Sequence, residues 1–576
     1  MRATIAGLTA VCAATMAGLL LGFAGGLDTL RAWSALAAGG FAGWMAWWSV
    51  ADLPKGEAPR GWAAWGVGVV FALFALRAFC WLLFAQEGEL FFLSPNNLGD
   101  LSLHLTYIRA FAHGAPFWPE NPIYAGTPLH YPFGVDLWNA LLLLAGADLQ
   151  RGLVWTGLLG SLAAAVALWR WGGAFAMGGF LFNGGIAGFA FLSTHKLADY
   201  QEKLDWKNIP LALFVTQRGL LYAVPAGLIL LWSWRARLLE GRRGLPFWIE
   251  CLLYATLPLF HLHTFLFLSA LLGCWLCLPA GGGVPSPRGA IFRLGLCAFL
   301  PASALVWLLT GGGVSGGMIH VTGGWMQADD GVFRCAVENF GALPLAVGAL
   351  LAWLWRRRGE PETRALAVVA LPSLLLFGIT CFVVLAEWAW DNTKLMLWAY
   401  LAVLPALWAM LREQALWLRA AAIGLLFFSG AVSLLGGLDG SHTGYTLARE
   451  EELDQLEAAL TPFPITATFA CMPTYNHPLL LLGHKVVAGY EGHLSSHGIP
   501  YQARFAALES VLRGEPGWES RARTLGADYL FWGPREREKY GGASPWQSPA
   551  TAGAPVAAEG PWGRLYALTP PHPAQR

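Results

Sequence analysis

The segment 96–107 places three side chains that can exchange protons at helical spacing. Asp100, His104 and Tyr107 are four and three residues apart, so a helix that begins near Asp100 carries all three on one face. The Asp100 carboxylate can act as a general base, and His104 and Tyr107 on the same face can bind and orient a substrate or orient the carboxylate. Gly99 allows a tight turn before them. The competing interpretation gives Asp100 a helix-capping role and makes His104 a hydrogen-bonding residue at the membrane interface.

The same loop ends in a second polar group directly before the next apolar run. This group contains His130, Tyr131 and Asp136. Such a concentration of polar side chains is unusual for this chain, which is otherwise strongly apolar. We therefore expect these three residues to bind substrate beside Asp100.

Another cluster holds Asp205, Lys207 and Asn208, and Gln217 and Arg218 follow it inside an apolar run. Charge inside such a run is costly and is usually functional. The fork of donors on Arg218 matches phosphate oxygens, and the carboxylate of Asp205 suits an acceptor hydroxyl or a metal ion. The competing interpretation is ordinary loop charge, with Arg218 extending to the membrane interface.

The remaining candidates lie at a predicted helix break and at a short turn. His261 and His263 flank a break that Pro258 favours by removing a backbone donor. We expect the two imidazoles to contact a lipid phosphate or a sugar, or more simply to line an interior cavity. Asp391 and Lys394 lie between two apolar runs, where Lys394 can neutralise a phosphate or can belong to a solvated turn.

Composition indicates which elements position these side chains. The chain has 576 residues, of which 56% are hydrophobic and 13% charged, whereas soluble proteins carry about 25% charged residues. The net charge of +1 excludes the basic surface that nucleic-acid binding requires. Apolar runs of the length that spans a bilayer begin near residues 4, 31, 61, 136, 153, 173, 210, 248, 264, 290, 341, 365, 393 and 417. We predict an α-helical polytopic membrane protein with about 12–14 membrane segments.

Basic loops orient these segments, because Lys and Arg are retained on the cytoplasmic side. This rule leaves 86–135, 311–340 and the chain from residue 438 outside the cytoplasm. The Gly-rich stretch Ala174–Ser193 is predicted to dip into the membrane and return to the same side. The loop 194–209 then also lies outside.

The chain changes character near residue 438. Acidic residues from Glu450 to Glu457 favour a soluble amphipathic helix, and Ala527–Trp532 favours a strand. We predict a transmembrane domain over 1–437 and a small extracytoplasmic α/β domain over 438–576. The last part, Gly541–Arg576, is rich in Pro, Ala and Gly and is predicted to be loose.

The order of these features resembles the GT-C superfamily of membrane glycosyltransferases. A Gly-Asp pair ending in Asp100, with His104 four residues on, lies in the first long external loop, and the run from Tyr131 to Asp136 returns to the membrane. The runs in 206–218, the turn before Lys394 and the C-terminal domain are similar to features of bacterial members. Three apolar runs precede the loop here, whereas most of the superfamily has one.

The resemblance implies an inverting transferase that takes a sugar from a polyisoprenyl-phosphate donor. It implies reaction on the extracytoplasmic face of the bacterial inner (cytoplasmic) membrane, with Asp100 as the general base or substrate orienter and Lys394 near the donor phosphate. The acceptor class stays open among glycan, lipid and protein. No cofactor is implied with certainty, and a divalent metal ion stays an open alternative.

Two other classes of protein fit parts of the pattern. A transporter or flippase for lipid-linked saccharides predicts inverted repeats and charges near the bilayer midplane, whereas the polar residues here cluster at the outer ends of the apolar runs. A non-catalytic assembly partner would tolerate the loss of Asp100.

Overall fold

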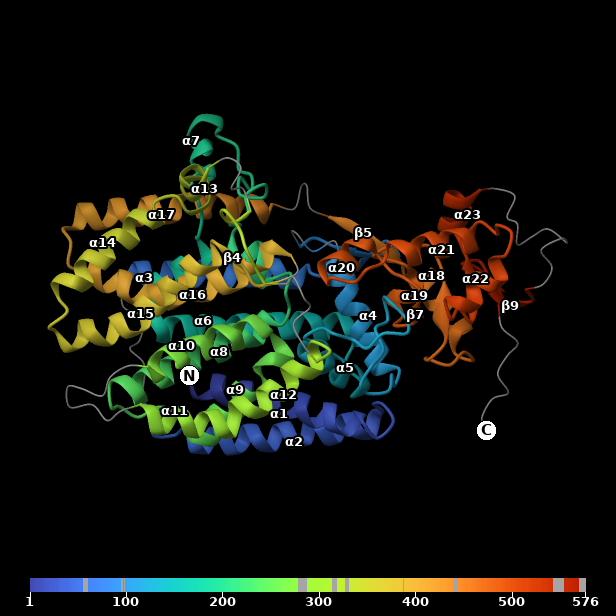
Figure 1. Cartoon of the computed structure of the whole chain (residues 1–576), viewed down its shortest axis with the longest axis horizontal. Coiled ribbons are helices and arrows are strands. Elements are labelled where there is room, and N and C mark those ends of the chain that lie inside the picture. Colours follow the sequence, from blue (N-terminus) through green and yellow to red (C-terminus); the bar gives the residue numbers. More distant parts are fainter. Residues whose placement is uncertain are drawn as a thin grey trace.

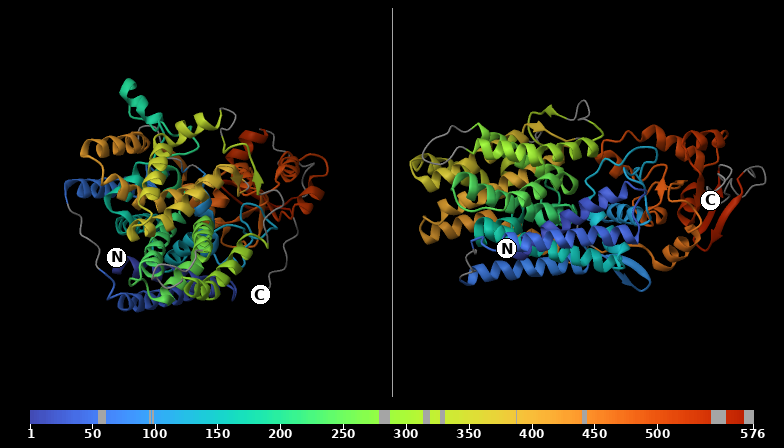
Figure 2. Two further views of the ribbon diagram at one scale, coloured as in Figure 1. Left: turned by 60° about the vertical axis from the view of Figure 1, so that its left-hand side comes forward. Right: turned by 90° about the horizontal axis from the view of Figure 1, so that it is seen from below.

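A computed structural model describes residues 1–54, 61–94, 97, 99–277, 287–312, 319–326, 331–386, 388–439, 444–541 and 554–568. Long helices form a bundle, and the C-terminal domain covers one end of it (Figure 1). Two further views show the same arrangement (Figure 2). The predicted fold class, a helical membrane protein with a small C-terminal α/β domain, is confirmed.

Most helices of the bundle begin within a few residues of a predicted apolar run. The longer helices of the bundle are α1 (Arg2–Gly22), α2 (Thr29–Ser49), α3 (Trp62–Cys80), α6 (Leu149–Leu181), α8 (Leu220–Trp234), α9 (Phe247–Phe260), α10 (Leu262–Leu276), α12 (Leu300–Leu309), α14 (Leu343–Arg356), α15 (Pro361–Thr380), α16 (Thr393–Leu411) and α17 (Leu416–Gly437). Shorter helices and turns join them: α4 (Asp100–Ala112), α5 (Gly134–Leu144), η1 (Ala187–Ala190), α7 (Phe191–Thr194), η2 (Pro210–Phe214), η3 (Arg235–Leu239), α11 (Arg288–Leu294), η4 (Gly295–Phe299), α13 (Val332–Phe340) and η6 (Ala389–Asn392). The run predicted near residue 210, in contrast, begins as the short turn η2 and continues as α8 only from Leu220.

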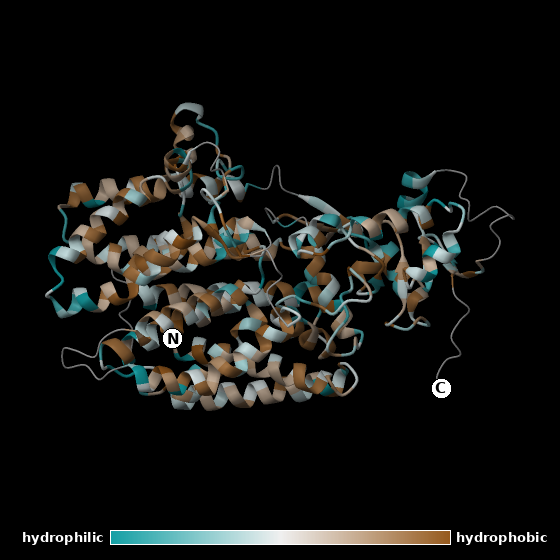
Figure 3. Ribbon diagram, viewed as in Figure 1, coloured by the Kyte–Doolittle hydropathy of each residue, from teal (hydrophilic) through white to brown (hydrophobic). Residues whose placement is uncertain are grey.

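Within the described residues, seven helices are long and apolar enough to cross a membrane, and α13 with α14 forms an eighth such span that is bent by 93°. Apolar residues run along the bundle helices, and hydrophilic residues gather at the loops (Figure 3). The chain is therefore an integral membrane protein. The number of long spans is below the predicted 12–14 because several apolar runs form helices of only 11–15 residues.

One of these short helices is α5, which has 11 residues. Its length of about 16 Å is well below the thickness of the hydrocarbon core, about 30 Å. The prediction of a membrane span that begins near residue 136 is therefore wrong. Leu141 of α5 packs against Gly18 near the end of α1, which places α5 beside α4 at the end of the bundle that the C-terminal domain covers.

The Gly-rich region in the second half of α6 also differs from the prediction. Gly172 and Gly173 have non-helical backbone angles and break α6 into two parts. Phe175 stacks on Trp408 near the end of α16, whereas the Gly179 carbonyl accepts from Tyr400, two turns earlier in that helix. The chain therefore turns back at the glycines and leaves again as a helix, so the predicted re-entrant dip over Ala174–Ser193 is wrong.

The predicted break at His261 is confirmed. His261 has φ −159° and ψ 102°, which ends α9 and begins α10. Tyr254 and Ser269 hydrogen-bond to each other across the two helices at 2.7 Å, so α9 and α10 form a hairpin with His261 at its apex. Each arm is about 22 Å long, which is shorter than a full span. Irregular backbone at such an apex is tolerated where it faces a cavity.

The C-terminal domain contains a five-stranded sheet in the order β7-β6-β8-β10-β9. β6 is parallel to β7 and β8, and β10 is antiparallel to β8 and β9. The strands are β5 (Tyr445–Arg449), β6 (Thr468–Ala470), β7 (Lys485–Val486), β8 (Tyr529–Trp532), β9 (Val556–Gly560) and β10 (Gly563–Ala567). The helices are α18 (Glu450–Leu460), α19 (Pro478–Leu481), α20 (Glu491–Ser496), α21 (Gln502–Leu512), α22 (Trp518–Thr524) and α23 (Pro534–Tyr540).

The prediction of a loose tail over Gly541–Arg576 is wrong for part of its length. β9 and β10 form a hairpin that extends the sheet through the pairing of β10 with β8. Residues 542–553 and 569–576 of this predicted tail lie outside the described residues. Lys55 and Arg60, which form the basic loop between the apolar runs that begin near residues 31 and 61, also lie outside them.

Backbone pairing joins the C-terminal domain to the loop between α3 and α5. β5 of the domain pairs with β2 (Glu89–Phe92), which in turn pairs with β1 (Phe84–Gln86). Val486 N–H donates to the Pro122 carbonyl at 2.9 Å, and Gly489 N–H donates to the Ile123 carbonyl at 2.8 Å. The predicted external loop 86–135 and the C-terminal domain are therefore one packed unit in the structure.

A smaller ribbon closes another side of the bundle end. β3 (His320–Val321) pairs antiparallel with β4 (Val383–Val384), which joins the loop after α12 to the turn before α16.

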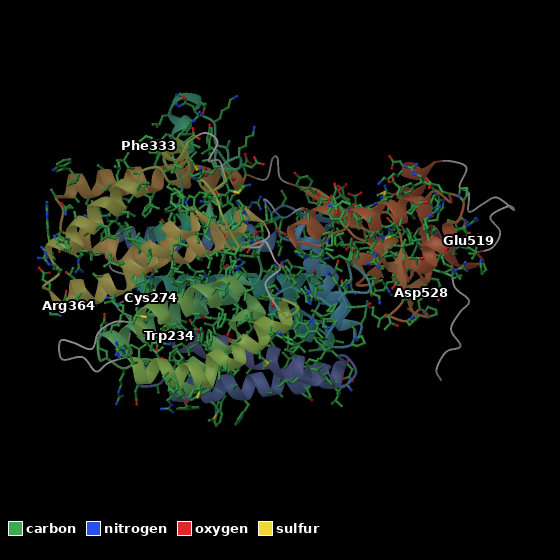
Figure 4. All side chains as sticks on the ribbon, viewed as in Figure 1. Trp234, Cys274, Phe333, Arg364, Glu519 and Asp528 are labelled. Carbon is green, nitrogen blue, oxygen red and sulfur yellow. The ribbon has the colours of Figure 1, made fainter. Side chains whose placement is uncertain are left out.

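The separation of Arg364 from the C-terminal domain gives a topological prediction. Figure 4 shows Arg364 and Glu519 at opposite ends of the molecule, and both side chains are exposed. With Cys277 and Cys297 replaced by Ser, we expect Glu519→Cys to react with an impermeant maleimide in intact cells, whereas Arg364→Cys reacts only after permeabilisation. Labelling in the opposite order would place the C-terminal domain in the cytoplasm.

Candidate functional site

A cavity of about 1510 Å³ lies where the bundle meets the C-terminal domain. Its walls come from the start of α4, the loop before α5, the 202–219 segment, the α9–α10 apex, η6 with α16, and α20. The predicted site residues that line it are Asp100, His130, Tyr131, Asp205, Lys207, Gln217, His261, His263, Asp391 and Lys394. The structure therefore brings together residues from five separate parts of the sequence.

Asp100 is the first residue of α4, and Gly99 is the N-cap. Because the N-cap is Gly99, Asp100 does not have the helix-capping role of the competing interpretation. Burial raises the pKa of the Asp100 carboxyl, and the nearby charges of His104 and Lys394 oppose that rise. The carboxylate thus faces the cavity within electrostatic reach of Lys394.

Gly99 is required for space and not for its backbone angle. Its φ of −87° is accessible to any residue. A Cβ atom at this position would lie 2.9 Å from Nε2 of His493, so the imidazole of the C-terminal domain packs directly on the turn before Asp100. This close approach couples α20 to the start of α4.

His104 and Tyr107 lie behind the cavity wall. His104 Nδ1 donates to Oδ1 of Asp136 at 2.8 Å, and both side chains are buried. The Tyr131 ring bridges this layer to the cavity, with its centroid 5.4 Å from that of Tyr107 and 6.2 Å from that of His104. The sequence predicts that His104 and Tyr107 share a helical face with Asp100. In the structure, His104 and Tyr107 pack α4 on α5 below Asp100.

Arg218 and Asn208 also do not line the cavity. The Arg218 side chain is only 1% exposed, and its Nη2 donates to the Leu153 carbonyl at 3.3 Å. The Asn208 amide donates to the Leu181 carbonyl at 3.0 Å. Both side chains hold backbone in place, and Nε and Nη1 of Arg218 have no hydrogen-bond partner among the described residues. Arg218 does not line the cavity, so its contact with a donor phosphate stays a prediction.

The apex of the α9–α10 hairpin presents an imidazole N–H to the cavity. His261 Nδ1 accepts from the Thr264 backbone N–H at 3.2 Å, which places the imidazole proton on Nε2 in the neutral ring. That Nε2 is buried and has no hydrogen-bond partner among the described residues. Trp398 donates to the Thr264 hydroxyl at 2.7 Å and fixes the apex against α16. An unpaired buried donor in a cavity is a site for an anionic or hydroxyl ligand.

Lys394 lies beside this apex at the start of α16. Its Nζ is 2.8 Å from Oδ2 of Asp391. The Trp390 indole donates to the Asp205 carbonyl at 2.9 Å, so η6 also holds the 205–207 segment at the cavity. Glu387, at the beginning of the predicted turn, lies outside the described residues.

An apolar groove leads away from this cationic end of the cavity. α10 packs against α9, α15 and α16, whereas α12 packs mainly against α9, and lining residues from α10, α12 and α15 face the space between them. These residues are Leu262, Leu266, Phe267, Ala270, Ser303, Val306, Trp307, Leu309, Leu376 and Ile379. The exposed fraction is 39% for Leu266 and 61% for Trp307, so the groove opens at the apolar surface of the bundle.

The site also contains residues of the C-terminal domain, in a Gly-rich stretch over 489–498 whose His and Tyr side chains suit a surface beside a sugar or the mouth of an active site. Tyr490, His493, Ser495 and His497 of the C-terminal domain line the cavity. The local signals are these Gly-rich turns and the four-residue spacing of the two histidines. Only the docking of α20 over α4 brings them to the cavity.

Side chains that could ligate a metal ion do not cluster in the described residues. Within the part of the chain that the structure describes, no three His, Cys, Asp or Glu side chains come together as ligands.

Comparison with known proteins adds a fold-level similarity. Neither a family model nor a curated protein matches the chain. Among solved structures, it is similar to the crystal structure of the Archaeoglobus fulgidus oligosaccharyltransferase tethered with an acceptor peptide. The sequences are 11% identical, the TM-score is 0.39, and the similarity covers 82% of this chain and 69% of that chain. A similarity of this size does not by itself assign an activity.

The buried pair of His104 and Asp136 gives a stability prediction. Asp136→Ala leaves the His104 N–H unsatisfied, so we expect the free energy of unfolding to fall by about 1–3 kcal/mol. Asp136→Asn keeps an acceptor and should lose less. Reversible unfolding in mixed micelles measures the change, and Glu120→Gln at the exposed pair with Lys485 is the control, with an effect below about 1 kcal/mol. Equal stability of Asp136→Ala and the wild type would contradict the assigned contact.

Proposed function

We propose that this protein is a membrane glycosyltransferase that moves a sugar from a lipid-phosphate-linked donor to an acceptor with inversion at the anomeric carbon. The observation that carries the proposal is one cavity with three chemically distinct parts. The carboxylate of Asp100 and the hydrogen-bond donors of Lys394 and His261 face the same space. The apolar groove between α10 and α12 opens into that space. This combination suits a ligand with a lipid tail, a phosphate and a transferable group.

The donor phosphate is proposed to lie between Lys394 and the hairpin apex. The ammonium of Lys394 and the free Nε2–H of His261 are donors for phosphate oxygens. His263 lines the same part of the cavity. These donors act on the charge that develops as the phosphate leaves, which is the kind of electrostatic stabilisation that accelerates such reactions.

The lipid tail is proposed to follow the groove along α10. Leu262, Leu266 and Ala270 are spaced by four residues and form one face of that helix. Because the isoprenoid chain already lies in the bilayer, its binding to this face depends on van der Waals packing and not on the removal of apolar surface from water. The groove opens toward the lipid-facing surface of the bundle, where a membrane-bound donor is present.

Asp100 is proposed to act as the general base in a single displacement. Its carboxylate takes the proton of the acceptor hydroxyl while that oxygen bonds to the anomeric carbon. The bond between that carbon and the phosphate oxygen breaks, and its electron pair leaves with the lipid phosphate beside Lys394. His104, held by Asp136, contributes to the field at Asp100 and acts as a positioning residue.

The orientation of the protein is part of the proposal. Basic residues such as Arg357 lie in the loops that join α14 to α15, and Arg357 pairs with Glu413 of the next cytoplasmic loop. Because basic loops are retained in the cytoplasm, the cavity and the C-terminal domain are proposed to lie on the extracytoplasmic face of a bacterial inner membrane.

The base assignment predicts the effect of Asp100→Asn. Loss of a general base lowers the rate by roughly 10²–10⁴-fold, whereas folding should be preserved because the N-cap of α4 is Gly99 and not Asp100. The measurement is release of polyisoprenyl phosphate from a polyisoprenyl-phosphate sugar by protein in lipid nanodiscs. Because its pKa is raised, Asp100 is ionised only above that pKa, so wild-type activity should fall as pH is lowered through it. Normal transfer by well-folded Asp100→Asn would defeat the assignment.

The phosphate assignment predicts the effect of Lys394→Ala. Loss of one hydrogen bond from a charged group costs about 1.5–3 kcal/mol, so donor affinity should fall by about 10–100-fold. Lys196 is exposed and does not line the cavity, so Lys196→Ala is the matched control. Titration of polyisoprenyl phosphate against tryptophan fluorescence measures the affinity. An unchanged dissociation constant for Lys394→Ala would remove Lys394 from the donor site.

A further inference from the structure

The C-terminal domain forms one complete wall of the cavity. Tyr490, Gly492, His493, Ser495, Ser496 and His497 of this wall line the cavity. His493 packs on Gly99, and the His497 ring lies 5.2 Å from the Tyr131 ring. The wall therefore faces the start of α4 and the Tyr131 ring.

The chemistry of this wall is neutral and rich in hydroxyl and ring groups. Burial lowers the pKa of His493 to about 3 and that of His497 to about 4. Each imidazole is therefore uncharged at neutral pH and offers one donor and one acceptor. Every residue of 490–497 is described, and the only carboxylate among them, Glu491, does not line the cavity.

Exposed aromatic rings continue the wall around the cavity. Tyr490 is 37% exposed and Trp388 is 48% exposed, and the Trp388 ring lies 5.1 Å from the Trp390 ring. The face of an aromatic ring is electron-rich, so it attracts the C–H groups on one face of a pyranose. Hydroxyl and imidazole groups beside such rings satisfy the polar edge of the same sugar.

We infer that Tyr490–His497 forms the acceptor subsite and that the acceptor is a neutral carbohydrate. This inference rests on the proposed function and names the acceptor class of the same site. A phosphorylated or carboxylated acceptor would require a cation on this wall, and residues 490–497 carry none. Lys394, whose charge acts on His497, is paired with Asp391 and is assigned to the donor phosphate. A peptide acceptor is commonly held at a free strand edge, whereas this wall is a helix and its flanking turns. The apolar groove that a lipid acceptor needs lies instead between α10 and α12.

The inference is tested by binding, so it requires no turnover. Full-length protein in lipid nanodiscs is examined by saturation-transfer NMR with neutral trisaccharides of glucose, galactose and mannose. We expect saturation of at least one trisaccharide, and a loss of about 5-fold in Tyr490→Ala and His497→Ala. Glu491→Gln, on the same helix but outside the cavity, is the matched control and should bind normally.

The outcomes separate this inference from the proposed function. Asp100→Asn should retain trisaccharide binding, so absence of transfer together with retained binding supports the subsite. No saturation of any trisaccharide overturns the inference. Saturation by Tyr490→Ala and His497→Ala that equals saturation by the wild type also overturns it, as does stronger saturation of a neutral hexapeptide than of the trisaccharides. If Tyr490→Ala lowers the melting temperature, Tyr490→Leu keeps the apolar bulk and removes the ring, and normal binding by that variant also overturns the inference.

Discussion

The backbone pairing between the C-terminal domain and the loop before α5 is the interaction on which the site depends. The hydrogen bonds of Val486 and Gly489 to the 122–123 carbonyls, and the pairing of β5 with β2, fix the domain on the bundle. Arg504 adds a hydrogen bond to the Ala125 carbonyl at 2.7 Å. Buried backbone groups must be paired, so these contacts favour the observed register. That register sets α20 over Asp100 and closes the cavity.

A second constraint is the division of the polar residues between two tasks. Asp100, Lys394 and His261 face the cavity, whereas buried side chains such as Asp136 and Asn208 hold other groups in place. Asn339, for example, accepts from the backbone N–H groups of residues 205 and 206. In an apolar bundle an unsatisfied polar group is costly. The buried polar side chains are therefore needed to position Asp100, Lys394 and His261 at the cavity. The two sets have the same residue types and cannot be distinguished by type alone.

Sequence reasoning predicted what depends on local pattern. The apolar runs predicted the bundle helices, the His261 break followed from local chemistry, and the acidic run predicted α18. It failed where distant contacts decide the structure. The strands β9 and β10 form because β8 offers them an edge, although their composition favours a loose chain. The reversal at Gly172–Gly173 depends on packing against α16, and the glycine at position 99 is required by a histidine almost 400 residues later. The histidines of α20 reach the cavity for the same non-local reason.

Under the proposed function, the opening between α10 and α12 supplies the lipid-linked donor to the cavity. A ligand that enters there diffuses in two dimensions and never crosses bulk water. Its effective concentration is therefore its mole fraction in the bilayer. Adding inert lipid or detergent dilutes such a ligand even when the number of molecules per litre is constant. Occupancy of the groove is thus controlled by membrane composition, whereas the face toward α20 responds to the aqueous phase.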